Sequence, residues 1–167
     1  MNRRAHRVDP SCHGQARPTV DLGDEHAREA RQAAELLVHD LQMGWDSHDA
    51  AIADRRLAVD VLWGSPFGAS VRGYDRLHQI HKELKRKAVG GASSRFEIVE
   101  CVAPAPGVAL AQVRRTALDA DGRALPADDD ASAAFSELAL YVLVKRGDCW
   151  WVCAAQNTSI STTPGAT

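Results

Sequence analysis

The feature of this sequence that most constrains its fold is a change in the spacing of apolar residues about halfway along the chain. In two segments before residue 94, apolar residues recur at every third or fourth position, which is the spacing of amphipathic helices. From residue 94 onward they alternate with other residues, which is the spacing of β-strands. This order predicts an α+β domain in which N-terminal helices pack in a strongly curved, mostly antiparallel sheet.

The first half of the chain contains the signals of a long helix, a short helix and a hairpin. The long helix is predicted over residues 24–47 and the short one over 48–55, with Asp46 and Ser47 as N-cap residues of the second. Within residues 59–73, β-branched and aromatic residues flank a cluster of Gly, Ser and Pro. That composition predicts two short strands joined by a turn.

A third helix is predicted over residues 74–88, because the apolar spacing there is again helical. The glycine pair at 90–91 ends it. His81 shares a helical face with Leu77 and Leu84, so we expect its imidazole to point into the interior of the domain.

The second half contains four predicted strands, over residues 94–103, 107–118, 133–146 and 149–158, which form an antiparallel meander. The last two strands are apolar on both faces. One face packs on the helices, and a second copy of the same sheet covers the other most simply, so we expect a homodimer. The acidic segment 119–132 either closes over the interior or lies in solvent, and the sequence leaves both open.

Length and charge limit the classes of function. A chain of 167 residues with 45% hydrophobic content is expected to form one domain, over residues 23–159. Residues 1–22 and 160–167 lack periodic apolar positions and are expected to be a flexible leader and tail. A net charge of -2 without a basic stripe argues against nucleic acid as a partner, and no apolar run is long enough to span a membrane. We expect a cytoplasmic protein.

Polar residues interrupt the apolar pattern of strand 107–118. Gln112, Arg114 and Thr116 share one face, and Arg115 lies opposite. If the first face points inward, a few polar groups lie above an apolar base, the usual composition of a small-molecule site, and Arg114 is a candidate for contact with the ligand. The alternative is a solvated strand end.

Three residues are candidates for acid and base chemistry. His81 is a candidate to donate or relay a proton. Asp60, which opens the first predicted strand, and Glu137, which lies within an otherwise apolar strand, are alternative candidates for the general base. The structural alternatives are a core histidine and carboxylates that face solvent. His78 and His81 have a spacing compatible with a metal, but no third ligand accompanies them and no cofactor motif is present, so we expect neither metal nor cofactor.

Aromatic and amide side chains are the remaining candidates for contact with a ligand. Aromatic rings offer flat apolar surface with a polar edge, although core packing is their first role. Amides at the end of the last strand either bind ligand or hold the neighbouring loop. These candidates are Trp63, Phe67, Tyr141, Trp150, Gln156 and Asn157.

Over about residues 30–160 the sequence resembles the NTF2-like, SnoaL-related proteins of the SgcJ/EcaC type that are encoded in enediyne polyketide biosynthesis clusters. Segments 62–84 and 140–160 carry the resemblance. Its most telling residues are Pro66, Phe67, Gly68, Gly73, His81, Trp150, Gln156, Asn157 and Thr158. Relatives often have His at the position of Gln156, so this chain departs from the pattern there.

The resemblance implies a cone of curved sheet, usually dimeric, whose cavity serves in related proteins as a polyketide cyclase or ketosteroid isomerase. One hypothesis is a cofactor-independent cyclase or isomerase that acts on a small apolar polyene or polyketide, with His81 as the proton donor. The other is a non-catalytic carrier or accessory protein that docks on a polyketide synthase, and the lack of a strong acid and base pair favours it.

Overall fold

The computed structural model of the chain describes residues 16–87, 93–125 and 135–160. The helices are α1 (Asp24–Asp46), α2 (Ala50–Ala53) and α3 (Tyr74–Lys87). The strands are β1 (Leu57–Gly64), β2 (Ser70–Arg72), β3 (Ser93–Ala105), β4 (Val108–Leu118), β5 (Glu137–Arg146) and β6 (Cys149–Ser159). The predicted α+β class is confirmed. Residues 1–15 of the expected leader, the glycine pair 90–91, residues 126–132 of the acidic segment and residues 161–167 of the tail lie outside the described residues.

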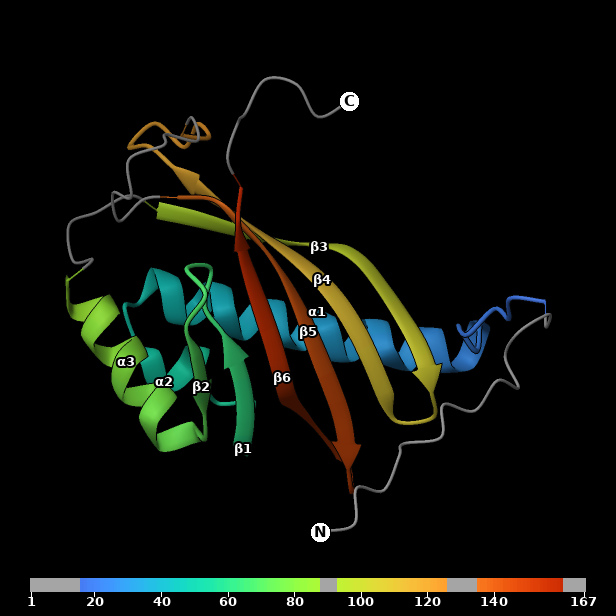
Figure 1. Cartoon of the computed structure of the whole chain (residues 1–167). Coiled ribbons are helices and arrows are strands. Elements are labelled where there is room, and N and C mark those ends of the chain that lie inside the picture. Colours follow the sequence, from blue (N-terminus) through green and yellow to red (C-terminus); the bar gives the residue numbers. More distant parts are fainter. Residues whose placement is uncertain (1–15, 88–92, 126–134, 161–167) are drawn as a thin grey trace, which may run out of the picture.

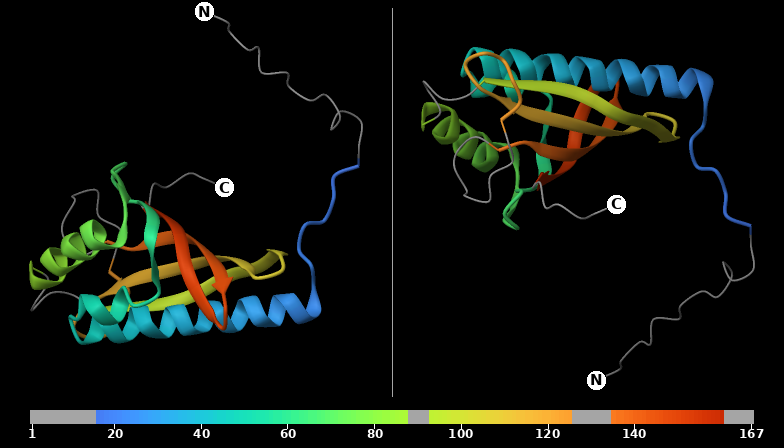
Figure 2. Two further views of the ribbon diagram at one scale, coloured as in Figure 1. Left: turned by 90° about the horizontal axis from the view of Figure 1, so that it is seen from below. Right: turned by 90° about the horizontal axis from the view of Figure 1, so that it is seen from above.

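All the strands belong to one six-stranded sheet with the order β2-β1-β6-β5-β4-β3. β1 and β6 are parallel, and the other neighbouring pairs are antiparallel. In Figure 1 the sheet crosses in front of α1, and α2 and α3 lie at one end of the molecule. Figure 2 shows the strands curling so that the helices lie on the concave side. The mostly antiparallel, strongly curved sheet is as predicted.

The core lies between α1 and the concave face of the sheet. The buried side chains of α1 include Ala30, Ala33 and Ala34, and those of β4 include Ala109 and Ala111. Because these side chains are small, the long helix packs closely on β3 and β4. The interior at this part of the cone is therefore filled by protein.

The direction of strand β4, which the sequence left open, places Arg114 outward. Arg114 is exposed on the convex face, whereas Arg115 is only 4% exposed and points into the interior. Alternate positions of β4 from Ala109 to Ala117 are buried. The two faces of this strand are both rich in apolar residues, so their composition does not reveal which one meets α1.

The expected caps of the second helix are also wrong. Asp49 caps α2, because its carboxylate oxygen accepts a hydrogen bond of 2.8 Å from the backbone amide of Ala51. Asp46 is the last residue of α1, and the Ser47 hydroxyl donates to the carbonyl of Met43. Both residues therefore belong to the end of the first helix.

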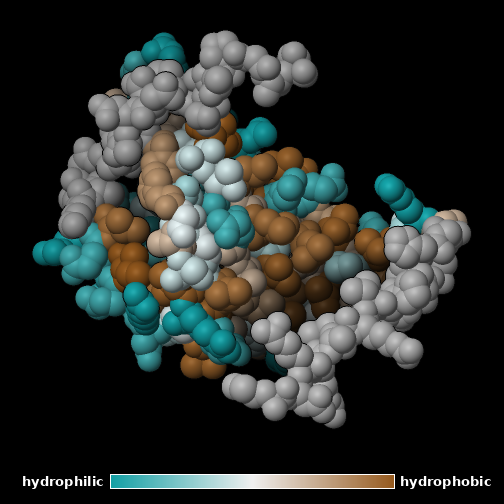
Figure 3. Space-filling view, viewed as in Figure 1, coloured by the Kyte–Doolittle hydropathy of each residue, from teal (hydrophilic) through white to brown (hydrophobic). Residues whose placement is uncertain are grey.

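The convex face of the sheet carries an apolar row that crosses five strands. Paired positions place the members of this row side by side, and they are Leu62, Ala154, Val142, Leu110 and Val102. Figure 3 shows hydrophobic atoms gathered over these strands. A hollow of about 260 Å³ lies on the same face, between β5, β6 and the β1–β2 hairpin. Within the described residues, no helix is both long and apolar enough to cross a lipid bilayer.

Candidate functional site

A buried carboxylate lies where α2 meets α3. Asp54 is the C-cap residue of α2 and is 2% exposed. One of its oxygens lies 2.8 Å from Nδ1 of His78, and the other lies 2.7 Å from Nδ1 of His81. The two imidazoles come from successive turns of α3, so one carboxylate holds both rings.

The inner face of α3 differs from the expected one. His81 points inward with Leu77, but Leu84 is 58% exposed. His78 and Lys85, one turn to either side of His81, complete the inner face together with Leu77. Only a narrow face of α3 points toward the interior. His78, His81 and Lys85 on that face are polar, although an amphipathic pattern would place apolar residues there.

The hydrogen bonds to Asp54 fix the tautomers of the two histidines. An ionised carboxylate only accepts hydrogen bonds, so Nδ1 of each neutral ring carries the hydrogen. Nε2 is then left with a free lone pair and is able to accept a proton. When it does so, the carboxylate stabilises the resulting imidazolium, which is the role of the acid in catalytic Asp–His pairs.

His81 is part of a wall of three aromatic side chains. The centre of the Trp63 ring lies 5.1 Å from the centre of the His81 ring and 6.0 Å from the centre of the Tyr141 ring, and both contacts are edge to face. Trp63 and Tyr141 are both paired with Ala155 of β6, which lies between them in the sheet. Because the side chain of Ala155 is small, the rings of Trp63 and Tyr141 can contact each other across it.

Each of these three side chains has a polar atom without a partner among the described residues. No hydrogen bond joins the Tyr141 hydroxyl, the indole N–H of Trp63 or Nε2 of His81 to another of these residues. Apolar surface with a few free polar groups is the composition of a small-molecule site.

Tyr141 is suited to donate a hydrogen bond and unsuited to act as a base. Burial raises its pKa, the carboxylates of Glu137 and Asp54 raise it further, and only Arg115 acts in the opposite direction. The hydroxyl therefore keeps its proton at neutral pH. A neutral phenol donates to a carbonyl oxygen or to the enolate oxygen that forms from it.

A second polar cluster lies at the end of β4. The Arg115 guanidinium donates to Glu137 at 3.0 Å and lies over the rings of Trp45 and Phe135, at 4.6 and 4.9 Å. Glu137 is thus held in an ion pair with its side chain 17% exposed, and it is not a free base beside His81.

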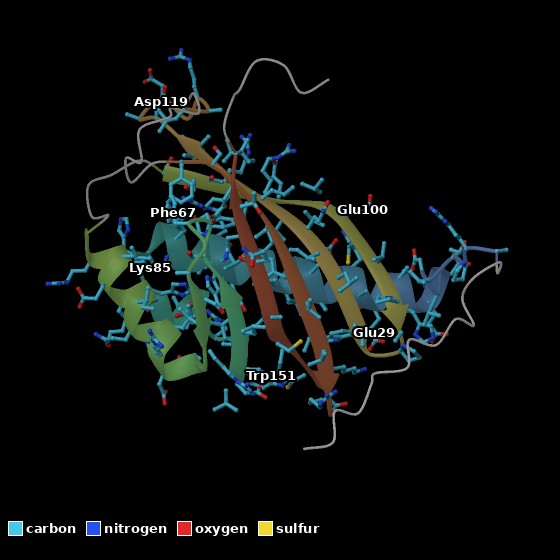
Figure 4. All side chains as sticks on the ribbon, viewed as in Figure 1. Glu29, Phe67, Lys85, Glu100, Asp119 and Trp151 are labelled. Atoms are coloured by element: carbon cyan, nitrogen blue, oxygen red, sulfur yellow. The ribbon has the colours of Figure 1, made fainter. Side chains whose placement is uncertain are left out.

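The other acidic candidate lies away from the aromatic wall. Asp60 is exposed on β1, so the structure does not bring it to His81. Phe67, on the β1–β2 turn, is 67% exposed and packs edge to face on Phe135 at 5.3 Å. Figure 4 labels Phe67 and Lys85 at the same end of the molecule.

The candidates on β6 are spread along that strand. Trp150 belongs to the buried core at the other end of β6, near Trp151, which Figure 4 labels far from Lys85. Asn157 is 3% exposed and donates to the carbonyl of Gly64 at 2.8 Å. Gln156 is exposed and lies directly over Gly64, where a Cβ atom would come within 1.9 Å of the Gln156 amide oxygen. These two amides connect β6 to β1.

Sequence reasoning missed the residue that organises the site. The interaction of Asp54 with His78 spans 24 positions, so no local motif connects them. The available signal was the three-residue spacing of His78 and His81, which we considered only as a metal site. No group of His, Cys, Asp and Glu within residues 16–87, 93–125 and 135–160 is arranged to hold a metal ion.

Two surface hollows lie outside this wall. One, of about 350 Å³, runs between α1 and β3 and is lined by charged and apolar residues that include Arg31, Glu35 and Phe96. The other is the hollow on the convex face. Neither is lined by Trp63, His81 or Tyr141.

Comparison with known proteins identifies the fold. No family model and no curated protein matches the sequence. A domain with a cystatin-like fold from Nostoc punctiforme is similar over 80% of this chain and 79% of its own, with 18% identity and a TM-score of 0.66. A ketosteroid isomerase-like protein from Erwinia carotovora is similar over 83% of this chain and 99% of its own, with 16% identity and a TM-score of 0.59. An NTF2-like protein from Shewanella oneidensis is similar over 77% and 98%, with 14% identity and a TM-score of 0.61. The chain therefore has the NTF2-like, cystatin-like fold.

Proposed function

We propose that this protein binds a small, largely apolar carbonyl compound against the wall of Trp63, His81 and Tyr141 and transfers a proton on it without a cofactor. One observation carries the proposal. The Trp63 ring contacts both the His81 ring of the Asp54–His81 pair and the ring of the neutral Tyr141. Among the described residues, Nε2 of His81 and the Tyr141 hydroxyl have no hydrogen-bond partner. A base and a hydrogen-bond donor thus share one aromatic wall.

The proposed reaction begins with removal of a proton from the carbon beside the carbonyl group. Nε2 of His81 takes the proton, and the electron pair of the broken C–H bond moves to the carbonyl oxygen to form an enolate. The Tyr141 hydroxyl donates a hydrogen bond to that oxygen. Asp54 stabilises the imidazolium, which returns the proton to a different carbon, so the net result is an isomerisation.

As the substrate class we propose a polyene or polyketide intermediate of enediyne biosynthesis. Support for this part comes from the resemblance of segments 62–84 and 140–160 to proteins of those clusters. An apolar wall with few polar groups suits such a molecule. The Erwinia protein of similar fold is described as ketosteroid isomerase-like, which agrees with a reaction at a carbonyl compound.

The test is conversion of a β,γ-unsaturated cyclohexenone to its conjugated isomer, followed by ultraviolet absorbance. We expect turnover by the wild type, and a rate lower by about a hundredfold in His81→Gln, which is the usual contribution of a general base. His39→Gln is the matched control, because His39 is an exposed histidine on α1. Equal rates for wild type and His81→Gln would remove His81 from the reaction.

The carrier hypothesis predicts a different result in the same experiment. Binding of polyene or enone without any isomerisation would indicate a protein that shelters its ligand or presents it to a synthase. Quenching of tryptophan fluorescence measures that binding, because Trp63 lies in the proposed wall.

A further inference from the structure

Two cationic side chains each lie close to one indole ring, that of Trp45, at the end of the molecule that holds α3. The Lys85 ammonium lies 4.9 Å from the centre of the Trp45 ring, and the Arg115 guanidinium lies 4.6 Å from it. Lys85 belongs to the inner face of α3, and Trp45 lies in the last turn of α1. We call Lys85 and Arg115 the cationic pair.

Among the described residues, only one member of the cationic pair, Arg115, is in an ion pair with a carboxylate. Glu137 is bound to Arg115, at 3.0 Å. Among the described residues, no carboxylate lies within ion-pair distance of Lys85, whose ammonium donates instead to the neutral carbonyl of Gly44 at 2.9 Å. Burial is the main cause that lowers the pKa of Lys85; Asp54 opposes it, Arg115 lowers the pKa further, and Asp49 and Asp46 raise it. An anion bound at this point would offset the cost of burying the ammonium.

Arg115 also has unused hydrogen-bonding capacity. Its Nε donates to Glu137, and its Nη1 lies 3.5 Å from the Ser94 hydroxyl. Nη2 has no partner among the described residues. A guanidinium that is 4% exposed thus has an amino group available to donate to a ligand.

The cationic pair and the aromatic wall are separated by different amounts on the helix and on the sheet. On α3, Lys85 lies one turn, about 6 Å, from His81. Arg115 is paired with Glu137, and Ala111 is paired with Tyr141, four positions further along both strands. Four residues of an extended strand span about 13 Å. Between the two levels the inner face carries Val113 and Ala139, both buried and apolar.

We infer that the ligand of this protein is an apolar acid, whose carboxylate is bound by Lys85 and Arg115 and whose apolar body lies against Trp63, His81 and Tyr141. This inference rests on the proposed function and names the substrate class of that site. A carboxylate accepts hydrogen bonds from cationic side chains, and the two ends of the ligand are separated by between about 6 Å, the spacing on α3, and about 13 Å, the spacing along the sheet.

A purely structural role for Lys85 makes a different prediction. An ammonium beside the last carbonyls of a helix stabilises that helix, and Gly44 lies in the last turn of α1. If this were the whole role, loss of the charge would lower stability and would affect charged and neutral ligands alike. Discrimination between an acid and its ester is therefore the informative measurement.

The experiment measures binding of cis-parinaric acid, a conjugated polyene fatty acid, and of its methyl ester by their fluorescence. We expect wild type to bind the acid at least about tenfold more tightly than the ester, because a hydrogen bond to a charged group has about that effect on affinity. In Lys85→Gln the preference should disappear while affinity for the ester is kept. Lys85→Arg, which retains the charge, should retain the preference.

Lys82→Gln is the matched control, since Lys82 is exposed on the same helix. It should leave the preference for the acid intact. Equal binding of acid and ester by wild type, or a preference that survives in Lys85→Gln, would overturn the inference and leave the apolar site standing. Failure of wild type to bind either probe would contradict the proposed function and the inference with it.

Discussion

A single carboxylate, that of Asp54, determines how the two histidines of α3 are placed and which of their nitrogen atoms is free. Because Asp54 is 2% exposed, water hardly solvates its charge, and the carboxylate is stabilised instead by the hydrogen bonds that it accepts from the two histidine N–H groups. The same contacts that stabilise the carboxylate orient Nε2 of His81. Stability and chemistry are therefore coupled at this residue.

Asp54→Ala tests that coupling. Loss of two hydrogen bonds to a charged group should lower the free energy of unfolding by about 3 kcal/mol, measured by urea denaturation. Asp60→Ala is the control, because Asp60 is exposed and its loss should change stability by about 0.5 kcal/mol or less. Similar effects of the two substitutions would show that Asp54 is not bound as described.

Tyr141 gives a prediction about pH. Burial raises its pKa in the folded protein, so above about pH 10 the unfolded chain has released the phenol proton while the folded chain still holds it. The free energy of unfolding should therefore fall as the pH rises above about 10. Tyr141→Phe should make the fall less steep, as measured by urea denaturation at successive pH values. Parallel curves for the two proteins would contradict the burial of the hydroxyl.

At the scale of elements, α1 and α2 meet without room for a side chain. A Cβ atom on Gly44 would come within 2.4 Å of the backbone nitrogen of Ala53. The last turn of α1 therefore contains Gly because α2, and with it Asp54, packs directly on the helix.

Gly44→Ala tests this close contact. Alanine is the better helix former by about 1 kcal/mol, so the substitution would stabilise an isolated helix. Here we expect destabilisation by about 2 kcal/mol, since the backbone of α2 has to move. Met43→Ala, at a 45% exposed neighbouring position, should have a smaller effect. Thermal unfolding followed by circular dichroism compares the two.

The elements of this fold were predictable because each has its own period and turn residues. The side of each element that faces the core was less predictable. Both faces of β4 mix apolar and polar residues, which hid the inward direction of Arg115. On α3, His78 and Lys85 are partly buried where an amphipathic pattern favours Leu84. The Asp54 cluster combines an aspartate after one helix with two histidines of another, and only the folded chain brings them together.

At the scale of the whole molecule, the convex face of the sheet exposes apolar side chains that a second chain could cover. Its apolar row includes Leu62, which is 51% exposed, and the neighbouring Leu140 is 40% exposed. A second copy of the same sheet fits such a surface, because an isologous interface places apolar strands against apolar strands. We propose that the protein is a homodimer through this face.

Light scattering during size-exclusion chromatography tests the dimer. Wild type should have twice the mass of one chain, and Leu62→Glu should have the mass of one chain, because a charge in a buried apolar interface is unfavourable. Leu84→Glu, at an exposed leucine of α3, should remain dimeric. A monomeric wild type would show that the convex face is covered in some other way.

Binding of a small apolar molecule at the inner wall is tested most directly by NMR. The histidine ring signals are recorded while cyclohexenone is added, and His81→Gln assigns the signal of that ring. We predict that the His81 signal shifts and saturates, and that Tyr141→Phe weakens the binding, because the hydroxyl donates to the carbonyl oxygen. An unchanged His81 signal, with shifts instead at Leu62 and Leu140 of the convex face, would contradict the account.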